Sequence, residues 1–186
     1  MSIDTLKNLL PEYAKDIKLN LSSLVNEETL TSQQLWGCFL ACAMAGGNND
    51  IIRQINSEAS AHLTPEAQIA AKSAASIMAM NNVYYKFIGM SANSAYKTMP
   101  AKLRMNVIAN PGVDKGDFEL WSLAVSAMNG CKYCVDAHEA QLANHGLDSN
   151  AIQTAVRIAS VVAAAGATLS AETALQGITA HLSVAA

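Results

Sequence analysis

The sequence has few aromatic and few charged residues. Aromatic side chains make up 5% of the 186 residues and charged ones 15%, whereas apolar residues make up 51%. This apolar content excludes an intrinsically disordered chain, which combines low hydrophobicity with high net charge. Alternation of β-branched residues is also scarce, while alanine, the strongest helix former, is abundant. The composition therefore predicts an all-α fold.

The sequence also lacks an excess of basic residues and a recognisable targeting segment. Twelve basic and 15 acidic residues give a net charge of −3, so a nucleic acid is not an expected partner. Residues 1–7 contain no basic stretch followed by an apolar run. The uncharged stretch 158–171 is too short to span a bilayer and is interpreted as a buried helix plus a turn. We expect a cytoplasmic protein without a membrane segment.

Apolar spacing and capping residues divide the chain into helices. Thr64 and Pro65 are typical of an N-cap followed by a first helical residue. Gly166 is expected to separate the last two helices. The expected helices cover residues 4–20 with a break at Pro11, then 27–45, 50–61, 65–80, 117–129, 131–144, 150–165 and 171–183. We treat residues 1–186 as a single helical domain.

Two parts of the chain, roughly residues 27–90 and 112–175, resemble each other. The segment 34–36 matches 119–121 at an offset of 85, and further matches occur at an offset of 84. In this alignment, glycine and asparagine stand opposite the cysteines of the second copy: Gly46 opposite Cys131, and Asn49 opposite Cys134. The pattern predicts an internally duplicated helical unit with one active site per chain, in the second copy.

The four cysteines form two pairs. Cys38 and Cys42 are four residues apart in an apolar helix and are interpreted as core residues. Cys131 and Cys134 form a Cys-x-x-Cys motif, which in a cytosolic protein indicates redox chemistry or a metal site rather than a structural disulfide framework. Structural zinc needs four ligands. We favour redox chemistry over metal because few further ligands are at hand, namely Glu119, His138 and His145.

Cys131, Cys134 and His138 are spaced three and four residues apart, so they share one face of a helix. Gly130 precedes them, which places both cysteines in the first turn. There the free N–H groups and the helix dipole favour a thiolate. His138 can accept or return a proton, and Glu119 on the preceding helix is a candidate to complete a relay with it. One thiolate can attack a peroxide, after which the pair closes as a disulfide.

The pattern Glu119-x(11)-Cys131-x-x-Cys134-x-x-x-His138 resembles that of the AhpD-like alkyl hydroperoxidases, in the carboxymuconolactone decarboxylase-like superfamily. The segments 82–87 and 103–105 also resemble this family, and the likeness covers essentially the whole chain. It implies an AhpD-like helical bundle, a homotrimer and no bound cofactor or metal. It further implies that Cys134 is the peroxidatic cysteine that becomes a sulfenic acid, that Cys131 is its resolving and proton-donating partner, and that Glu119 and His138 form the relay.

The resemblance also implies partners for the dithiol. They are a hydroperoxide substrate, the peroxiredoxin AhpC, whose disulfide the protein would reduce, and a lipoyl-bearing dehydrogenase component. The reductant would then be dihydrolipoamide. The alternative function is that of a non-peroxidase member of the same superfamily, either a decarboxylase-like enzyme or a binding scaffold.

Tyr133 departs from the family pattern, which has a histidine between the two cysteines. A tyrosine hydroxyl can form hydrogen bonds but does not titrate near neutral pH. Tyr133 is therefore a candidate member of a modified relay. Which sulfur attacks is a separate question, because helix-end electrostatics favour Cys131 as the more acidic thiol whereas the resemblance makes Cys134 the attacking one.

Overall fold

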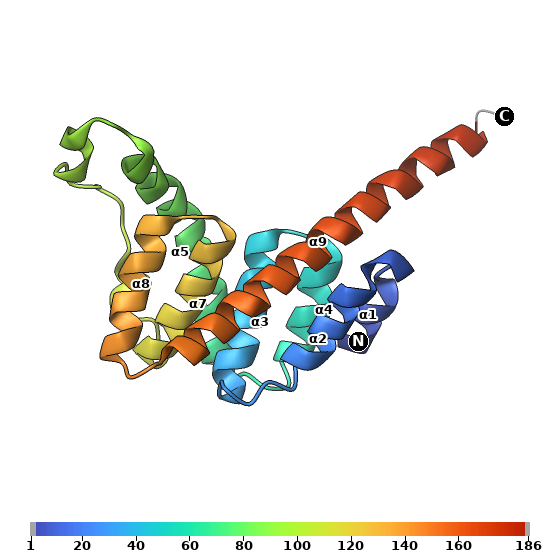
Figure 1. Cartoon of the computed structure of the whole chain (residues 1–186), viewed down its shortest axis with the longest axis horizontal. Coiled ribbons are helices and arrows are strands. Elements are labelled where there is room, and N and C mark those ends of the chain that lie inside the picture. Colours follow the sequence, from blue (N-terminus) through green and yellow to red (C-terminus); the bar gives the residue numbers. More distant parts are fainter. Residues whose placement is uncertain (1–2, 185–186) are drawn as a thin grey trace.

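The computed structural model describes residues 3–184, with side chains described for residues 3–176, and all regular elements of this part are helical (Figure 1). The predicted all-α fold is thus confirmed. The expected break at Pro11 is also found. In chain order the elements are α1 (Ile3–Leu9), η1 (Glu12–Ala14), α2 (Lys15–Leu24), α3 (Ser32–Gly46), α4 (Asn49–Ala59), α5 (Pro65–Met90), η2 (Ser94–Lys97), α6 (Asn106–Ala109), α7 (Lys115–Met128), α8 (Lys132–Asn144) and α9 (Ser149–Val184).

Helices α3 and α7 form the centre of the bundle. Each packs against the other and against both α5 and α9, and most residues of both helices are buried. Gly37 is required at their crossing, because a Cβ atom there would lie 2.1 Å from the Trp121 side chain. The Trp121 Nε1–H donates to the Gln34 carbonyl at 3.1 Å, and Gln34 Nε2 donates to Asp117 Oδ1 at 2.8 Å. These contacts join the two halves of the chain at the core.

The helices of the two halves follow one another in the same order. α3, α4 and α5 begin at residues 32, 49 and 65, and α7, α8 and α9 begin at 115, 132 and 149, so corresponding helices start 83, 83 and 84 residues apart. The middle helix of each half contacts its own first helix and the last helix of the other half: α4 packs on α3 and α9, and α8 packs on α7 and α5. The offsets are close to those found by comparing the sequences.

The N-caps of α4 and α8 give the register of this correspondence around the cysteines. Gly47 and Gly130, which both have positive φ angles of 71° and 63°, precede the two N-caps and are 83 residues apart. At this offset Cys131 corresponds to Asn48 and Cys134 to Ile51. The sequence alignment at offset 85, which placed Gly46 and Asn49 opposite the cysteines, was therefore out of register by two residues at this point.

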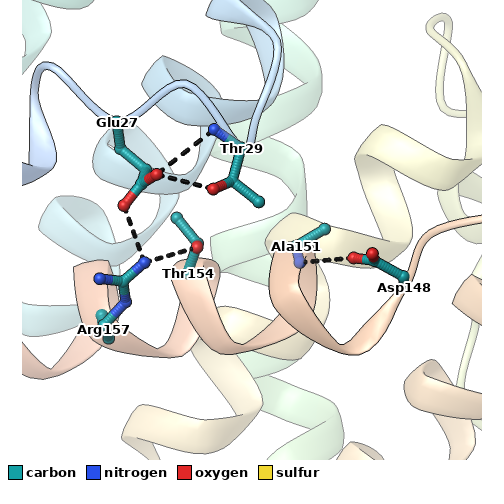
Figure 2. A network of polar contacts seen from close by, with 6 residues as sticks. All are labelled: Glu27, Thr29, Asp148, Ala151, Thr154 and Arg157. Atoms are coloured by element: carbon teal, nitrogen blue, oxygen red, sulfur yellow. Dashed lines mark hydrogen bonds and ion pairs between the residues drawn. The ribbon is translucent and has the colours of Figure 1, made fainter.

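Helix α3 begins later than expected, at Ser32 instead of residue 27. Thr31 is its N-cap: its hydroxyl accepts a hydrogen bond from the Gln34 N–H, and the Gln34 side chain accepts one from the Thr31 N–H. Glu27 lies in the preceding turn, where its carboxylate accepts hydrogen bonds from the Thr29 hydroxyl at 2.6 Å and from Arg157 of α9 at 2.8 Å (Figure 2). These bonds, above all that from Thr29, lower the pKa of Glu27. A capping box therefore sets the helix start.

Two helices run further than expected. α5 continues ten residues beyond residue 80, to Met90, and α9 continues through Gly166 to Val184. The predicted break at Gly166 was wrong, because this residue lies against the start of α4. Its carbonyl accepts a hydrogen bond from Asn48 Nδ2 at 3.4 Å, and a Cβ atom at Gly166 would already lie 3.6 Å from the Asn48 side chain.

Helix α9 crosses the bundle and its C-terminal part extends beyond the other helices (Figure 1). Over residues 149–176 it is long and apolar enough to cross a membrane by length and composition alone. One face of it, however, is buried against α3 and α7 and includes Ala155, Ile158, Val162 and Ala165, each at most 1% exposed. Stretch 158–171 is thus part of a core helix, as expected, but contains no turn.

Candidate active site

The two cysteines of the Cys-x-x-Cys motif form a disulfide at the start of α8. Their Cα atoms are 5.3 Å apart, and Cys131 is the N-cap of the helix, where its Sγ accepts a hydrogen bond from the Cys134 N–H at 3.3 Å. The positive φ of Gly130 lets the chain turn sharply out of α7 into this cap. The first-turn location predicted for the thiols is therefore found, with α8 proper beginning one residue later than expected.

The disulfide is almost completely enclosed by the protein. Cys131 is 0% exposed and Cys134 is 4% exposed. Since an attacking thiolate must meet its substrate, this difference in exposure favours Cys134 as the sulfur that an external reagent reaches first.

Glu119 of α7 and His138 of α8 form a buried pair beside the disulfide. Glu119 Oε2 lies 2.6 Å from His138 Nδ1, and each residue is 8% exposed. The other ring nitrogen, Nε2, lies 3.2 Å from the Met78 sulfur on α5. The imidazole is thus held between a carboxylate and a sulfur, one turn beyond Cys134.

A second set of polar contacts fastens the α7–α8 connection to α5. The Cys131 N–H donates to the Ser126 carbonyl at 3.1 Å, and the Ser126 hydroxyl accepts from Asn82 Nδ2 at 2.9 Å. The Asn82 Oδ1 in turn accepts from Asn129 Nδ2 at 2.8 Å, and Lys86 Nζ donates to the Asn129 carbonyl at 3.0 Å. Because these bonds fix the backbone on both sides of Gly130, they also fix the position of the disulfide.

Tyr133 lies outside the Glu119–His138 pair. Its side chain is 54% exposed and stacks on Tyr85 of α5, with ring centroids 5.1 Å apart and an interplanar angle of 7°. Burial and, secondarily, the neighbouring tyrosines raise the pKa of Tyr85. Residues 131, 134 and 138 share a face that residue 133 does not, so the geometry does not bring this tyrosine into a relay with His138.

A cavity of about 710 Å³ borders the start of α8. It lies between the end of α5, the segment 96–101 and the residues flanking the disulfide, Gly130 and Tyr133. Its volume is in the range of small-molecule sites. Its other walls are tyrosines, apolar side chains, lysines and one acidic residue: Tyr84, Tyr85, Ile88, Met90, Met99, Lys86, Lys97, Lys132 and Asp136.

The other cysteine pair lies in a different environment. Cys38 and Cys42 of α3 are free thiols that are 0% exposed, which confirms their predicted place in the core. Burial raises the pKa of both thiols well above the ordinary value. Within residues 3–176, no group of three or more His, Cys, Asp or Glu side chains is arranged to hold a metal ion.

Reasoning from sequence did not assign contacts to Met78, Asn82 or Ser126. Met78 is 60 residues from His138, and a methionine on an apolar helix is ordinarily a core residue. Asn82, with its neighbour Asn81, was a usable signal, because two adjacent asparagines are unusual in the middle of an apolar helix. Both are buried, at 2% and 5% exposure.

Comparison with known proteins places these residues in a family. The chain matches the carboxymuconolactone decarboxylase family over residues 95–177, a segment that contains Glu119, both cysteines of the disulfide and His138. It is 60% identical to an alkyl hydroperoxide reductase AhpD of Maricaulis maris, over 92% of this chain and 99% of that protein. The AhpD proteins of Hyphomonas neptunium and Brucella suis are 58% and 55% identical, over 94% and 92% of this chain and 97% and 98% of their own lengths.

Proposed function

We propose that this oxidoreductase reduces alkyl hydroperoxides with its Cys131/Cys134 dithiol. The chain belongs to the carboxymuconolactone decarboxylase family and, within it, to the AhpD alkyl hydroperoxide reductases. One observation supports the proposal above the others. The redox pair lies at a helix start, and a histidine one turn further on is held by a buried carboxylate. This is the combination of nucleophile, proton carrier and orienting acid that thiol chemistry requires.

In the proposed reaction the Cys134 thiolate attacks the terminal oxygen of the hydroperoxide. An S–O bond forms as the O–O bond breaks, and the departing alkoxide takes up a proton and leaves as the alcohol. The Cys131 sulfur then attacks the Cys134 sulfur, so that the S–S bond forms, the S–O bond breaks and water leaves with a second proton. In sum, one hydroperoxide and two thiols give one alcohol, one water and the disulfide.

His138 is the group that we propose for both proton transfers. It is one turn from Cys134 on the same face of α8, and Glu119 fixes its ring through Nδ1. A carboxylate in that position orients the imidazole and stabilises its protonated form during transfer. A positioned acid–base group of this kind contributes roughly 10²- to 10⁴-fold to a rate.

Cys134 is proposed as the attacking sulfur although both thiols benefit from the helix start. The Cys134 N–H caps Cys131 Sγ, which favours a thiolate there. Cys131, however, is 0% exposed, whereas Cys134 is 4% exposed and lies nearer to His138 in the helix. Access and proton transfer therefore outweigh the difference in acidity, and Cys131 acts as the resolving thiol.

Regeneration needs two electrons from outside the protein. We propose a dithiol donor, dihydrolipoamide carried by a lipoyl-bearing dehydrogenase component, and AhpC as the peroxiredoxin whose disulfide the same pair reduces. The proposal also includes a homotrimer in the cytoplasm and no bound cofactor. The relatives are named alkyl hydroperoxide reductases, which supports a hydroperoxide as the substrate.

The test is a peroxidase assay with a simple alkyl hydroperoxide and dihydrolipoamide, together with thiol counting. The wild-type protein should form one alcohol for each dithiol consumed, and Cys134→Ser should abolish turnover. Cys131→Ser should still react once and leave a sulfenic acid on Cys134 that a dimedone-type probe traps. Cys42→Ala, in the buried pair of α3, is the matched control and should keep the wild-type rate.

Three results would contradict the proposal. Peroxidase activity of Cys134→Ser equal to that of the wild type would remove the proposed nucleophile. A sulfenic acid trapped on Cys131 of Cys134→Ser, formed at the wild-type rate, would exchange the roles of the two sulfurs. Wild-type protein that reduces no hydroperoxide would instead favour a non-peroxidase member of the family.

A further inference from the structure

Ser122, in the middle of α7, has a buried hydroxyl group that the structure leaves without a partner. The residue is 0% exposed, and within the described part of the chain no donor or acceptor reaches its Oγ. A buried polar group without a hydrogen bond is costly and rare, so its presence requires an explanation. Other helical hydroxyls bond to the carbonyl four residues earlier, at 2.8–3.0 Å: those of Ser22, Ser160, Thr168 and Thr173.

Ser122 lies between two layers of contacts that join α5, α7 and α8. In one layer His138 contacts Glu119 of α7 and Met78 of α5. In the other layer, Ser126 of α7 contacts Cys131 at the start of α8 and Asn82 of α5. Since residues 119, 122 and 126 are three and four apart, they share one face of α7, and Ser122 is placed between the two layers.

Cys134 occupies the matching place on α8. It is four residues before His138 and three after Cys131, so it lies on the face of α8 that meets both layers. α7 and α8 run in opposite directions here, because residue 119 meets 138 and residue 126 meets 131. With a rise of about 1.5 Å per residue, Ser122 and Cys134 differ by only about 1.5 Å in height between the two layers. The helices thus bring the unpartnered hydroxyl level with the Cys134 side chain.

We infer that the Ser122 hydroxyl donates a hydrogen bond to the Cys134 sulfur in the reduced protein and thereby favours the attacking thiolate. The structure holds the disulfide form, in which neither sulfur carries charge and each is a weak acceptor. A thiolate is negatively charged, and a hydrogen bond to the charged form lowers the pKa of a thiol. The inference rests on the proposed function in taking Cys134 as the attacking sulfur.

Several other groups near Cys134 influence its charge. His138 and Cys131 lie on the same helix, Glu119 faces it from α7, and Lys86 and Tyr85 face the start of α8 from α5. Replacing Ser122 changes none of these charges. A change in the thiol titration of a Ser122 variant would therefore report the hydroxyl itself.

The experiment measures alkylation of Cys134 by iodoacetamide as a function of pH, in reduced protein with Cys131→Ser so that one accessible thiol titrates. Ser122→Ala should raise the apparent pKa of Cys134 by about one unit, which slows alkylation about tenfold at pH values below the pKa. Ser122→Thr, which keeps a hydroxyl, should restore most of the rate. Ser22→Ala, which removes a hydroxyl on α2 that bonds to the Lys18 carbonyl, should leave this titration unchanged.

A second measurement separates this role from a structural one. In the disulfide form Ser122→Ala should not lower the melting temperature, because no hydrogen bond is lost there. An unchanged thiol pKa in Ser122→Ala, an equal shift in Ser22→Ala, or a lowered melting temperature of the oxidised Ser122→Ala variant would overturn the inference. The titration uses no peroxide, so a protein that shows the pKa shift but reduces no hydroperoxide would contradict the proposed function alone.

Discussion

Helices α4 and α8 hold corresponding places in the two halves of the chain, yet of the two only α8 carries the Cys131–Cys134 disulfide. At the N-cap α4 has Asn48 and α8 has Cys131. Two further pairs contrast an apolar residue with a reactive one: Ile51 and Cys134 at the third helical residue, and Ile55 and His138 at the seventh. Both isoleucines are buried, at 1% and 0% exposure, like Cys134 and His138. The difference between the two helices therefore lies in side-chain chemistry and not in burial.

The N-caps of α4 and α8 use different hydrogen-bond acceptors in the same position. Asn48 accepts hydrogen bonds from the N–H groups of Asp50 and Ile51, which is a conventional cap. Cys131 uses its sulfur to accept from the Cys134 N–H in the same position. The reactive pair thus occupies a place where the scaffold already requires an acceptor and where backbone dipoles stabilise negative charge.

The residues of neighbouring helices that correspond to one another around α4 and α8 also differ in side-chain chemistry. Glu119, the fifth residue of α7, corresponds to Trp36, the fifth of α3, and Met78 corresponds to Val162 at the offset of 84. Trp36 is 5% and Val162 1% exposed. The first half therefore has apolar residues where the second half has the buried Glu119–His138 pair.

The largest effect is expected from moving the dithiol into the first half. Asn48→Cys with Ile51→Cys, in a Cys131→Ala, Cys134→Ala background, should close a disulfide at the start of α4. Peroxidase activity should nevertheless be at least about a thousandfold below wild type, because Ile55 and Trp36 cannot transfer protons. Thiol counting and the peroxidase assay check both statements. A rate within tenfold of wild type would show that a dithiol at a helix start is sufficient by itself.

The converse change makes α8 resemble α4. His138→Ile with Glu119→Gln should lower kcat/KM for the hydroperoxide about 10²- to 10³-fold, since it removes the acid–base group while keeping the dithiol. Changing both residues together avoids leaving one buried charge unpaired, so the protein should remain folded. His145→Gln, at the C-cap of α8, is the control and should keep wild-type kinetics. Equal kinetics in the double variant would exclude His138 from catalysis.

The smallest effect concerns the pH dependence of stability caused by the buried thiols of α3. Burial raises the pKa of Cys38 and Cys42 in the folded state, whereas an unfolded thiol titrates near pH 8.5. Their contribution is thus fully present below about pH 8.5 and is lost as pH rises above it. Each thiol should reduce the free energy of unfolding by about 1.4 kcal/mol between pH 7.5 and 9.5.

Urea denaturation of the reduced protein at the two pH values measures this loss. Cys38→Ala with Cys42→Ala should lower the stability at both pH values but show a smaller decrease between them than the parent protein does. An identical decrease would mean that the two buried thiols do not cause the pH dependence. In the folded parent protein, alkylating reagents should react with Cys134 but not with the thiols of α3.

Local signals in the sequence were sufficient to predict most of the helices and the residues of the candidate site. Gly130 before two cysteines and a histidine at helical spacing predicted one face at a helix start, and the structure has it. The predicted helix break at Gly166 and the predicted helix start at Glu27 were wrong for the same reason. Each residue forms contacts with a distant segment, Gly166 with Asn48 and Glu27 with Arg157, and local propensity contains no information about such contacts.

The sequence by itself determined the helical class, the redox pair and the residues able to move a proton, because these depend on composition and on spacings of three and four along one helix. Only the tertiary structure decided that Glu119 lies 2.6 Å from His138, that the Met78 sulfur contacts the other ring nitrogen of His138, and that the Ser122 hydroxyl is buried without a partner. These contacts join α5, α7 and α8 over separations of 19 and 60 residues. They depend on how the helices pack, which side-chain volumes at crossings such as Gly37 and Trp121 decide.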